Sequence, residues 1–303
     1  MKNFIKFFYN MKVTNINFIN NYYEFNHNNN YYRLYILNEE YNIYNYNNIY
    51  TINKELINNT LMSEIILNKD KNIITTYHNI NYILLKINCN INKNITLEEI
   101  DYLSKVKIVN NNKSNWGLLW SKKIDYLEEL ISENGKKYPQ VVNSFNYFIG
   151  LSENAISYYN NIDIDNNMMY SISHKVLRPT DKVDSLYNPL NIIYDYRVRD
   201  VAEYIKNSFW TDNHNIYSEL NNYLYKNNLS LNEVKLLISR VLFPSFYFDL
   251  YEDIFNYNKD EKILNNIISR IDEYEEYLNS IIIYFKRFYP IDEIEWLKKK
   301  IIN

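Results

Sequence analysis

Glycine is scarce in this chain of 303 residues, and its distribution excludes one kind of phosphate site. The three glycines are Gly117, Gly135 and Gly150, so the first 116 residues contain none. A loop that wraps phosphate groups with its backbone amides needs glycine where the backbone approaches the ligand. The N-terminal third therefore cannot form a glycine-rich phosphate loop.

Cysteine, long apolar runs and a strong excess of charge are also missing. The single cysteine, Cys89, excludes an internal disulfide framework and is typical of a reducing compartment. No apolar run approaches the ~18–20 residues of a membrane span, and the apolar part of Met1–Tyr9 is too short for a signal peptide. The net charge of −3 and the pI near 5.9 show no excess of basic residues that would indicate nucleic-acid binding. We therefore expect a cytoplasmic protein with neither a membrane span nor a nucleic-acid partner.

Hydrophobic residues make up 47% of the chain, which is normal for a globular protein. A chain of this length can bury a sizeable core as one large domain or as two lobes. The chain has 33 tyrosines, and their number partly reflects an overall composition that is also rich in Asn, Ile and Lys. We expect some of them to form an aromatic surface that binds partner proteins.

The first 90 residues predict a small unit with two β-hairpins and one helix. Aromatic and β-branched runs predict the paired strands, which are 21–26 with 31–37 and 73–77 with 82–87. Apolar residues at helical spacing predict a helix over Ile52–Leu67, between the hairpins. The polar segment Asn88–Asn94 is the predicted connector to the rest of the chain.

From Ile95 onward the apolar periodicity predicts mostly helices. The hydroxyl of Thr96 is a predicted helix cap, and Ser230 with Glu233 has the spacing of a capping box. The longer predicted helices are 116–131, 141–159, 216–225, 230–242, 246–257, 261–289 and 291–300. Asparagine runs predict loop tips at 28–30, 110–112 and 166–167.

The stretch 170–210 stands out because it holds three of the chain's seven arginines. They are Arg178, Arg197 and Arg199. In a composition that favours lysine, an arginine often marks a place that needs a planar, forked donor. Asp200, followed three residues later by Glu203, has the spacing of a helix N-cap with its capping-box partner.

Three other segments join this stretch in a recognisable order and spacing. They are 116–128 (WGLLWSKKIDYLE), 144–158 (SFNYFIGLSENAISY) and 237–248 (LISRVLFPSFYF). With the His at 174 and the helix start at 199–203, they resemble the aminoglycoside-phosphotransferase-like kinases. The chain is more closely similar to the spore-coat-associated kinase-like proteins of the Bacilli, the CotS/YutH group.

The resemblance covers about residues 110–250, and the N-terminal third agrees in pattern only. It implies an α+β, two-lobed fold of the protein-kinase-like, aminoglycoside phosphotransferase type. A small sheet-plus-helix lobe would span 1–90 and a mostly helical lobe 91–303, with the catalytic segment at 170–206.

The resemblance also implies where the catalytic groups of a phosphotransferase would lie, and several are replaced. His174 matches the histidine of the family's His-Gly-Asp motif, whereas Lys175 and Val176 take the places of the glycine and the catalytic aspartate. A valine can neither accept a proton nor orient a hydroxyl group, and loss of such a base typically removes about 10²–10⁴ in rate. His174 stays a candidate catalytic residue, but we expect a core histidine hydrogen-bonded to backbone. The strand at 31–37 offers Arg33 where a lysine is required.

The metal ligands of active relatives are altered too. The magnesium aspartate falls near Asn188, whose neutral oxygen is a poorer ligand for a hard dication. Asp195 is the nearest alternative, as a metal ligand or a catalytic residue, although Arg197 and Arg199 beside it favour a salt bridge. Two loop acids are further metal candidates: Asp181 and Asp184.

Three hypotheses follow. The leading one is a catalytically impaired kinase-like protein with a structural or interaction role at the bacterial spore coat, its partners being coat proteins. The alternative is an active phosphotransferase on a small molecule or coat protein that uses repositioned carboxylates. The third is a protein-binding module in a bacterium that does not sporulate. ATP and magnesium are implied as cofactors by the resemblance alone.

Overall fold

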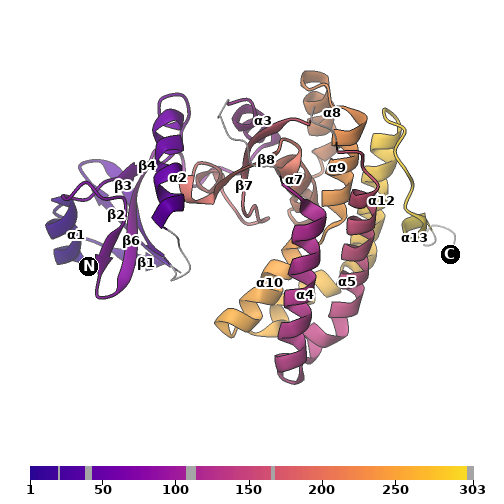
Figure 1. Cartoon of the computed structure of the whole chain (residues 1–303), viewed down its shortest axis with the longest axis horizontal. Helices are drawn as coiled ribbons and strands as arrows, with labels where there is room; N and C mark the ends of the chain where they lie inside the picture. Colours follow the sequence, from indigo (N-terminus) through magenta and orange to yellow (C-terminus); the bar gives the residue numbers. More distant parts are fainter. Residues whose placement is uncertain (20, 38–42, 107–113, 165–167, 299–303) are drawn as a thin grey trace. The chain divides into compact units, whose positions relative to one another are not determined.

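The computed structural model describes residues 1–19, 21–37, 43–106, 114–164 and 168–298 of the chain. The chain divides into two compact units, which can be followed along the sequence in Figure 1. The first comprises Met1–Ile108, His174–Leu177 and Asp181–Ile193; the second comprises Val109–Ser173, Arg178–Thr180 and Tyr194–Asn303. The expected lobe boundary near residue 90 stays a prediction.

The first unit is built on an antiparallel sheet. Its strands are β1 (Asn17–Ile19), β2 (Tyr22–His27), β3 (Asn30–Leu37), β4 (Glu64–Ile66), β5 (Thr75–Tyr77) and β6 (Ile80–Ile87). The strand order is β1-β2-β3-β6-β4, with β5 also pairing with β6. Both predicted hairpins are confirmed. The first turns through Asn28 and Asn29, whose positive φ angles of 48° and 61° suit asparagine better than most residues.

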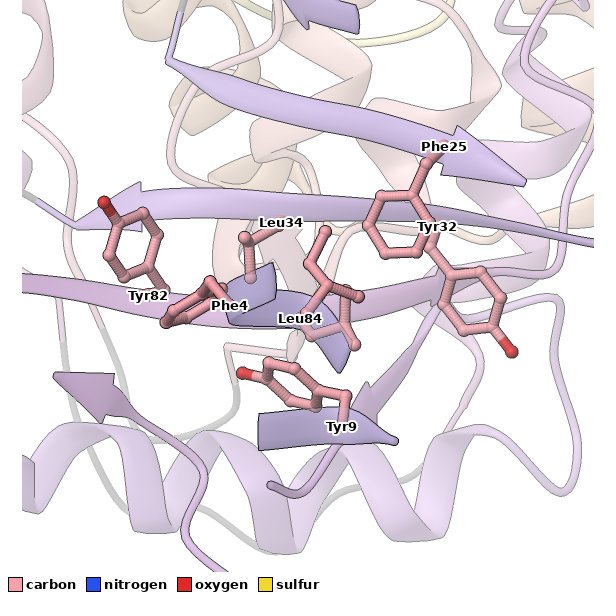
Figure 2. Close-up of a cluster of buried hydrophobic side chains, with 8 residues drawn as sticks. Phe4, Tyr9, Phe25, Tyr32, Leu34, Tyr82 and Leu84 are labelled. Carbon is pink, nitrogen blue, oxygen red and sulfur yellow. The ribbon is translucent and has the colours of Figure 1, made fainter. Parts of the chain in front are cut away.

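Helices cover both faces of this sheet. Phe4 and Tyr9 of α1 (Lys2–Tyr9) pack on alternate residues of the central strands, including Leu34 and Leu84, as Figure 2 shows. On the other face, α2 (Ile43–Leu56) packs against Ile83 and Leu85 among others. The period-2 alternation of the strands therefore divides their apolar residues between two small cores.

The predicted helix over Ile52–Leu67 is wrong in its second half, because α2 ends at Leu56 and residues 64–66 form β4. The buried side chain of Asn53 explains the change. Its Nδ2 donates to the Ser63 carbonyl at 2.8 Å, and its Oδ1 accepts from the Ile65 amide at 3.0 Å. Asn53 thus ties the end of the helix to the strand, which lets Ile65 enter the sheet core.

The second unit is helical. Its helices are α4 (Trp116–Asn134), α5 (Pro139–Asn160), α7 (Arg199–Trp210), α8 (Ile216–Lys226), α9 (Leu231–Leu242), α10 (Ser245–Tyr257), α11 (Asn265–Ile268), α12 (Ile271–Lys286) and α13 (Glu295–Lys298). In its core α5 packs on α4 and α9, and α9 also contacts α7 and α12. The predicted hydroxyl cap at Thr96 opens α3 (Leu97–Ser104) in the first unit. The Ser230–Glu233 capping box opens α9.

Two predictions near the C-terminus are wrong. The helix expected over 261–289 is divided into a 3-10 turn, α11 and α12. Arg270 breaks it with a φ of −113° and turns its guanidinium toward Glu273 and Asp212. The helix expected over 291–300 begins later, at Glu295 of α13, and its last two expected positions, 299 and 300, lie outside the described residues. The loop tips predicted at 110–112 and 166–167 lie outside the described residues.

Gly117 allows α4 and α5 to approach closely. A Cβ atom there would lie 2.9 Å from the Tyr159 ring and 2.8 Å from the Asn160 side chain. The Tyr159 ring contacts both Trp116 and Trp120, which limits its freedom to move aside. Gly150, also helical, has no atom within 4 Å of the corresponding position.

We predict that Gly117→Ala lowers the free energy of unfolding by about 1–3 kcal/mol through overpacking. The matched control Gly150→Ala should raise it by up to about 1 kcal/mol, because alanine is the better helix former. Urea unfolding followed by circular dichroism measures both. Equal effects of the two substitutions would contradict the close approach at Gly117.

Candidate functional site

The segment that carries the predicted site residues is a pair of strands with two short helical turns between them. Strand β7 (Tyr170–His174) pairs with β8 (Ile192–Tyr196), and α7 follows directly. Between the strands lie α6 (Val183–Leu186) and the 3-10 turn η2 (Pro189–Asn191). Pro189 suits the first position of such a turn because its missing amide hydrogen needs no partner there.

His174 is a core residue. Its side chain is 1% exposed, and its Nε2 lies 2.8 Å from the Leu186 carbonyl oxygen, to which it donates. Val176, at the position matched to the catalytic aspartate, presents an exposed apolar side chain. Its backbone is pinned by Asn191, whose Nδ2 donates to the Val176 carbonyl at 2.9 Å and whose Oδ1 accepts from the Val176 amide at 3.2 Å.

Asn188 caps η2. Its Oδ1 accepts a hydrogen bond from the Leu190 amide at 3.0 Å, and its Nδ2 lies 3.5 Å from the Tyr35 hydroxyl. The side-chain oxygen that would have to bind a dication is therefore used by the turn itself. Asp181 lies half-buried in the turn before α6.

Asp184, in the first turn of α6, forms an ion pair with Arg33 of β3. Arg33 is 8% exposed, and its guanidinium lies 4.8 Å from the centroid of the Tyr22 ring. Burial opposes the charge, but neighbouring Tyr35 and Asp184 raise the pKa of Arg33 above its ordinary value. The position where a phosphotransferase needs a lysine thus holds a cation that is already neutralised.

Asp195 on β8 is 2% exposed and accepts hydrogen bonds on both carboxylate oxygens. The Trp116 indole donates to both oxygens at 3.1 and 3.0 Å, the Tyr196 amide to Oδ1 at 2.8 Å, and Arg199 Nη1 to Oδ2 at 2.7 Å. Of the two arginines considered as partners, Arg199 makes the salt bridge. Arg197 instead donates to Glu233 at 2.8 Å.

The protein partners of these residues disfavour a magnesium ion. The oxygens of Asp195 and Asn188 accept hydrogen bonds from the protein, and Asp184 is paired with Arg33. Across the described ranges, no three His, Cys, Asp or Glu side chains are grouped so as to hold a metal. The catalytic and metal roles considered for His174, Asp195 and Asn188 stay predictions, and the geometry favours structural roles for all three.

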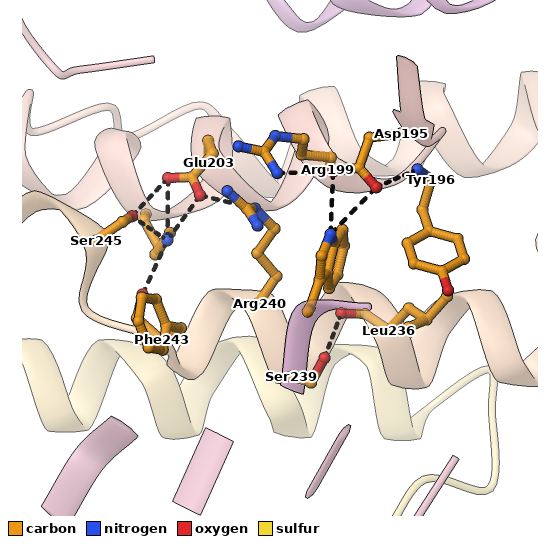
Figure 3. A network of polar contacts seen from close by, with 11 residues as sticks. Asp195, Tyr196, Arg199, Glu203, Leu236, Ser239, Arg240, Phe243 and Ser245 are labelled. Carbon is orange, nitrogen blue, oxygen red and sulfur yellow. Dashed lines mark hydrogen bonds and ion pairs between the residues drawn. The ribbon is translucent and has the colours of Figure 1, made fainter. Parts of the chain in front are cut away.

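The N-cap predicted at Asp200 is wrong, because α7 begins one residue earlier and Val198 occupies the cap position. Glu203 does not reach back to the helix start. It is 6% exposed and lies at the centre of a buried network, drawn in Figure 3. The tertiary partners of Glu203, which the local pattern cannot show, outweigh the capping arrangement.

The network compensates each buried charge. Lys206 Nζ lies 3.0 Å from the Glu203 carboxylate and also donates to the Phe243 carbonyl at 2.9 Å and to Ser245 Oγ at 2.6 Å. Ser245 in turn donates to Glu203 at 2.9 Å, and Arg240 Nε lies 2.8 Å from Glu203 Oε1. A cavity of about 10 Å³ beside these groups has room for about one water molecule.

Trp116 joins this network to Asp195. The Arg240 guanidinium lies 4.8 Å from the centroid of the Trp116 ring, whose indole donates to Asp195. Sequence reasoning missed this arrangement because Trp116, Asp195 and Arg240 are far apart along the chain. The available signal was their scarcity, since tryptophan and arginine are rare here and both occur within the segments that carry the resemblance.

Burial alone would raise the pKa of Glu203, but the charges of Lys206 and Arg240 lower it to about 2. Burial lowers the pKa of Lys206 to about 8, against the opposing effect of Glu203. The pair is therefore ionised at neutral pH.

Solved structures of similar fold are kinases of small molecules. An aminoglycoside phosphotransferase from Alicyclobacillus acidocaldarius superposes with a TM-score of 0.63 at 9% identity, covering 91% of this chain and 93% of that one. Spectinomycin phosphotransferase in complex with ADP and spectinomycin gives 0.56 at 14% identity, covering 95% and 94%. Amicoumacin kinase in complex with AMP-PNP and Ca²⁺ gives 0.53 at 12%, covering 91% and 90%. The fold is thus the two-lobed, kinase-like fold of the aminoglycoside phosphotransferases, as predicted.

The sequence comparisons define the family. Residues 2–281 match the family described as "Spore coat putative kinase YutH", and the chain belongs to it. The endospore coat-associated protein YutH of Bacillus subtilis (strain 168) is 30% identical over 210 residues, 61% of each chain. The match thus spans about three fifths of that relative's length. In the part of the chain that the structure describes, no helix is both long and apolar enough to span a bilayer.

We predict that Glu203→Gln lowers the free energy of unfolding at pH 7 by about 3–5 kcal/mol, because it leaves Lys206 and Arg240 partly uncompensated. The folded-state pKa of Glu203 lies below its ordinary value. Its contribution is therefore present above about pH 4.5 and is lost, on the order of 3 kcal/mol, as pH falls toward about 2.

Urea unfolding between pH 2 and 7 tests this prediction. The Gln variant should take up about one proton fewer on unfolding in the window from pH 4.5 to 2. The exposed Glu153→Gln is the matched control and should behave as the parent chain. Parallel pH profiles for all three proteins would show that folding does not shift the pKa of Glu203.

For the pair in the first unit, we predict that Arg33→Met or Asp184→Leu alone costs about 3 kcal/mol, since each leaves a largely buried charge unpaired. The double variant should recover most of that loss, because no uncompensated charge remains. A double-mutant cycle in urea measures the coupling. Strictly additive losses would show that the two side chains do not stabilise each other.

Proposed function

We propose that this chain is a kinase-like protein without phosphotransfer activity that serves as a structural or interaction component of the spore coat. The hydrogen bonding of Asp195 carries the proposal. This acid is the best remaining candidate for catalysis or metal binding, yet the indole, the backbone amide and the guanidinium group take up both of its oxygens.

Two further observations support the proposed lack of phosphotransfer activity. At the position matched to the catalytic base, the exposed apolar side chain of Val176 offers no group that could accept a proton. At the strand position that needs a lysine, Arg33 is paired with Asp184 rather than left to bind phosphate. The backbone of Val176 is bonded to Asn191 and the side chain of Arg33 to Asp184, which supports structural roles at both positions.

The family and the Bacillus subtilis relative support a location at the spore coat. The family description and the Bacillus subtilis protein both refer to the spore coat. We infer coat proteins as partners of this chain. The competing function is ATP-dependent phosphotransfer to a small molecule or coat protein, and the nucleotide complexes of the structural neighbours are its support.

Thermal unfolding with ATP and magnesium separates the two functions. A site with a Kd of about 50 µM would stabilise the fold by about 2.7 kcal/mol at about 5 mM ATP. We expect no change in melting temperature and no transfer of labelled phosphate to water, to the chain itself or to coat extract. An active aminoglycoside phosphotransferase serves as the positive control. Nucleotide-dependent stabilisation together with turnover would overturn the proposal.

Asp195→Asn distinguishes a structural from a catalytic aspartate. In a structural role, the substitution leaves Arg199 without its anionic partner and lowers the free energy of unfolding by about 3 kcal/mol. In a catalytic role, it would abolish nucleotide turnover and leave the melting temperature unchanged. Calorimetry and a phosphate-release assay on the same preparation measure both quantities.

A further inference from the structure

The first unit contains an open hollow that the proposed function does not use. It lies beside β1 and β2 and has a volume of about 200 Å³. Six polar residues line it: Thr14, Asn15, Asn17, Glu24, Asn26 and Tyr31. They come from four successive segments, namely the loop before β1, β1 itself, β2 and the start of β3.

The strand register explains why these side chains gather on one face. Asn17 lies directly opposite Glu24, and Glu24 lies opposite Arg33. Asn26 lies opposite Tyr31. Directly paired residues project on the same side of a sheet with Cβ atoms about 5 Å apart, and the next residue on that side follows two positions along the strand. The face is therefore a grid of hydrogen-bonding groups at a spacing of about 5–7 Å.

Much of the hydrogen-bonding capacity of this grid is unused. In the ranges that the structure describes, the side chains of Thr14, Asn15, Asn17 and Asn26 make no recorded hydrogen bond with the protein, and all four are exposed. Among the lining residues, the Tyr31 hydroxyl donates to Glu24. The amide groups can each offer a donor and an acceptor to a ligand.

The charge of the hollow selects among ligands. The residues that line it, among those described, include one carboxylate and neither lysine, arginine nor histidine. Arg33, which lies directly opposite Glu24 in the strand register, forms an ion pair with Asp184. A phosphate or carboxylate ligand would face Glu24 without a cation to balance it, so the hollow disfavours anions.

We propose that this hollow is a binding site for a neutral, polyhydroxylated ligand of monosaccharide size. Amide and carboxylate side chains suit hydroxyl groups, because each hydroxyl both donates and accepts, and Phe25 and Tyr31 add aromatic rings to the lining. For a sugar of about 12 heavy atoms, we expect a Kd on the order of a few millimolar. The site does not depend on whether the chain transfers phosphate.

Ligand titration by two-dimensional NMR tests the proposal on the full chain. The neutral probes are glucose, N-acetylglucosamine and myo-inositol; inorganic phosphate and spermidine are the anionic and cationic probes. We expect at least one neutral probe to shift the asparagine side-chain amide signals of residues 14–31 with a low-millimolar Kd. Phosphate should shift none of them.

Two substitutions and a matched control identify the site. Asn17→Leu and Asn26→Leu each remove an exposed amide of the grid and should weaken binding about tenfold. Asn143→Leu, an equally exposed asparagine on α5, should leave the affinity unchanged. The proposal is overturned if no neutral probe binds below about 50 mM, if only spermidine or phosphate binds, or if both grid variants retain the parent affinity.

Discussion

The buried ion pairs of Glu203 in the helical unit determine how the surrounding helices pack. Removing a carboxylate and an ammonium group from water costs several kcal/mol per ion, and only close partners offset that cost. Glu203 therefore requires Lys206 from its own helix, Arg240 from α9 and the hydroxyl of Ser245 at the start of α10. Because α9 supplies a charge and α10 a hydroxyl group to the ion pair on α7, the network fixes how α7, α9 and α10 lie against one another.

In the sheet unit, a buried charge is compensated by fewer groups. The guanidinium of Arg33 is largely buried and is balanced by Asp184, which lies 151 positions later in the chain. Other contacts hold the same late segment to this unit, among them the hydrogen bond from the Ser63 amide to the Tyr187 carbonyl at 2.8 Å. The region that would contain the reactive loop of a phosphotransferase therefore serves here to complete the sheet unit.

Local patterns in the sequence predict those elements whose partners are close along the chain. The two hairpins and the capping box at Ser230 follow from turn and cap chemistry within a few residues. The helix expected over Ile52–Leu67 fails because Asn53 bonds to Ser63 and Ile65, and that bonding depends on a strand formed elsewhere in the sheet.

The same limit applies to the candidate site. The salt bridge of Asp195 with Arg199 lies within one helical turn of sequence, and its pattern is visible. The bond from Trp116 to Asp195 joins positions 79 residues apart, and no spacing rule reveals it. Scarcity of arginine and tryptophan marks such residues as worth attention without showing which others they meet.

There is a physical reason why the segments that resemble the kinase-like family lie where they do along the chain. The segments 116–128 and 237–248 and the stretch around Glu203 supply Trp116, Arg240 and the central acid of one buried network. The helical unit therefore depends on these residue types for its packing, whatever reaction it carries out. Val176, the residue that we match to the catalytic aspartate, has an exposed side chain and takes no part in this network. The buried residues of the core thus account for the resemblance to kinase-like proteins. Whether the chain transfers phosphate depends on the residues of the candidate site alone.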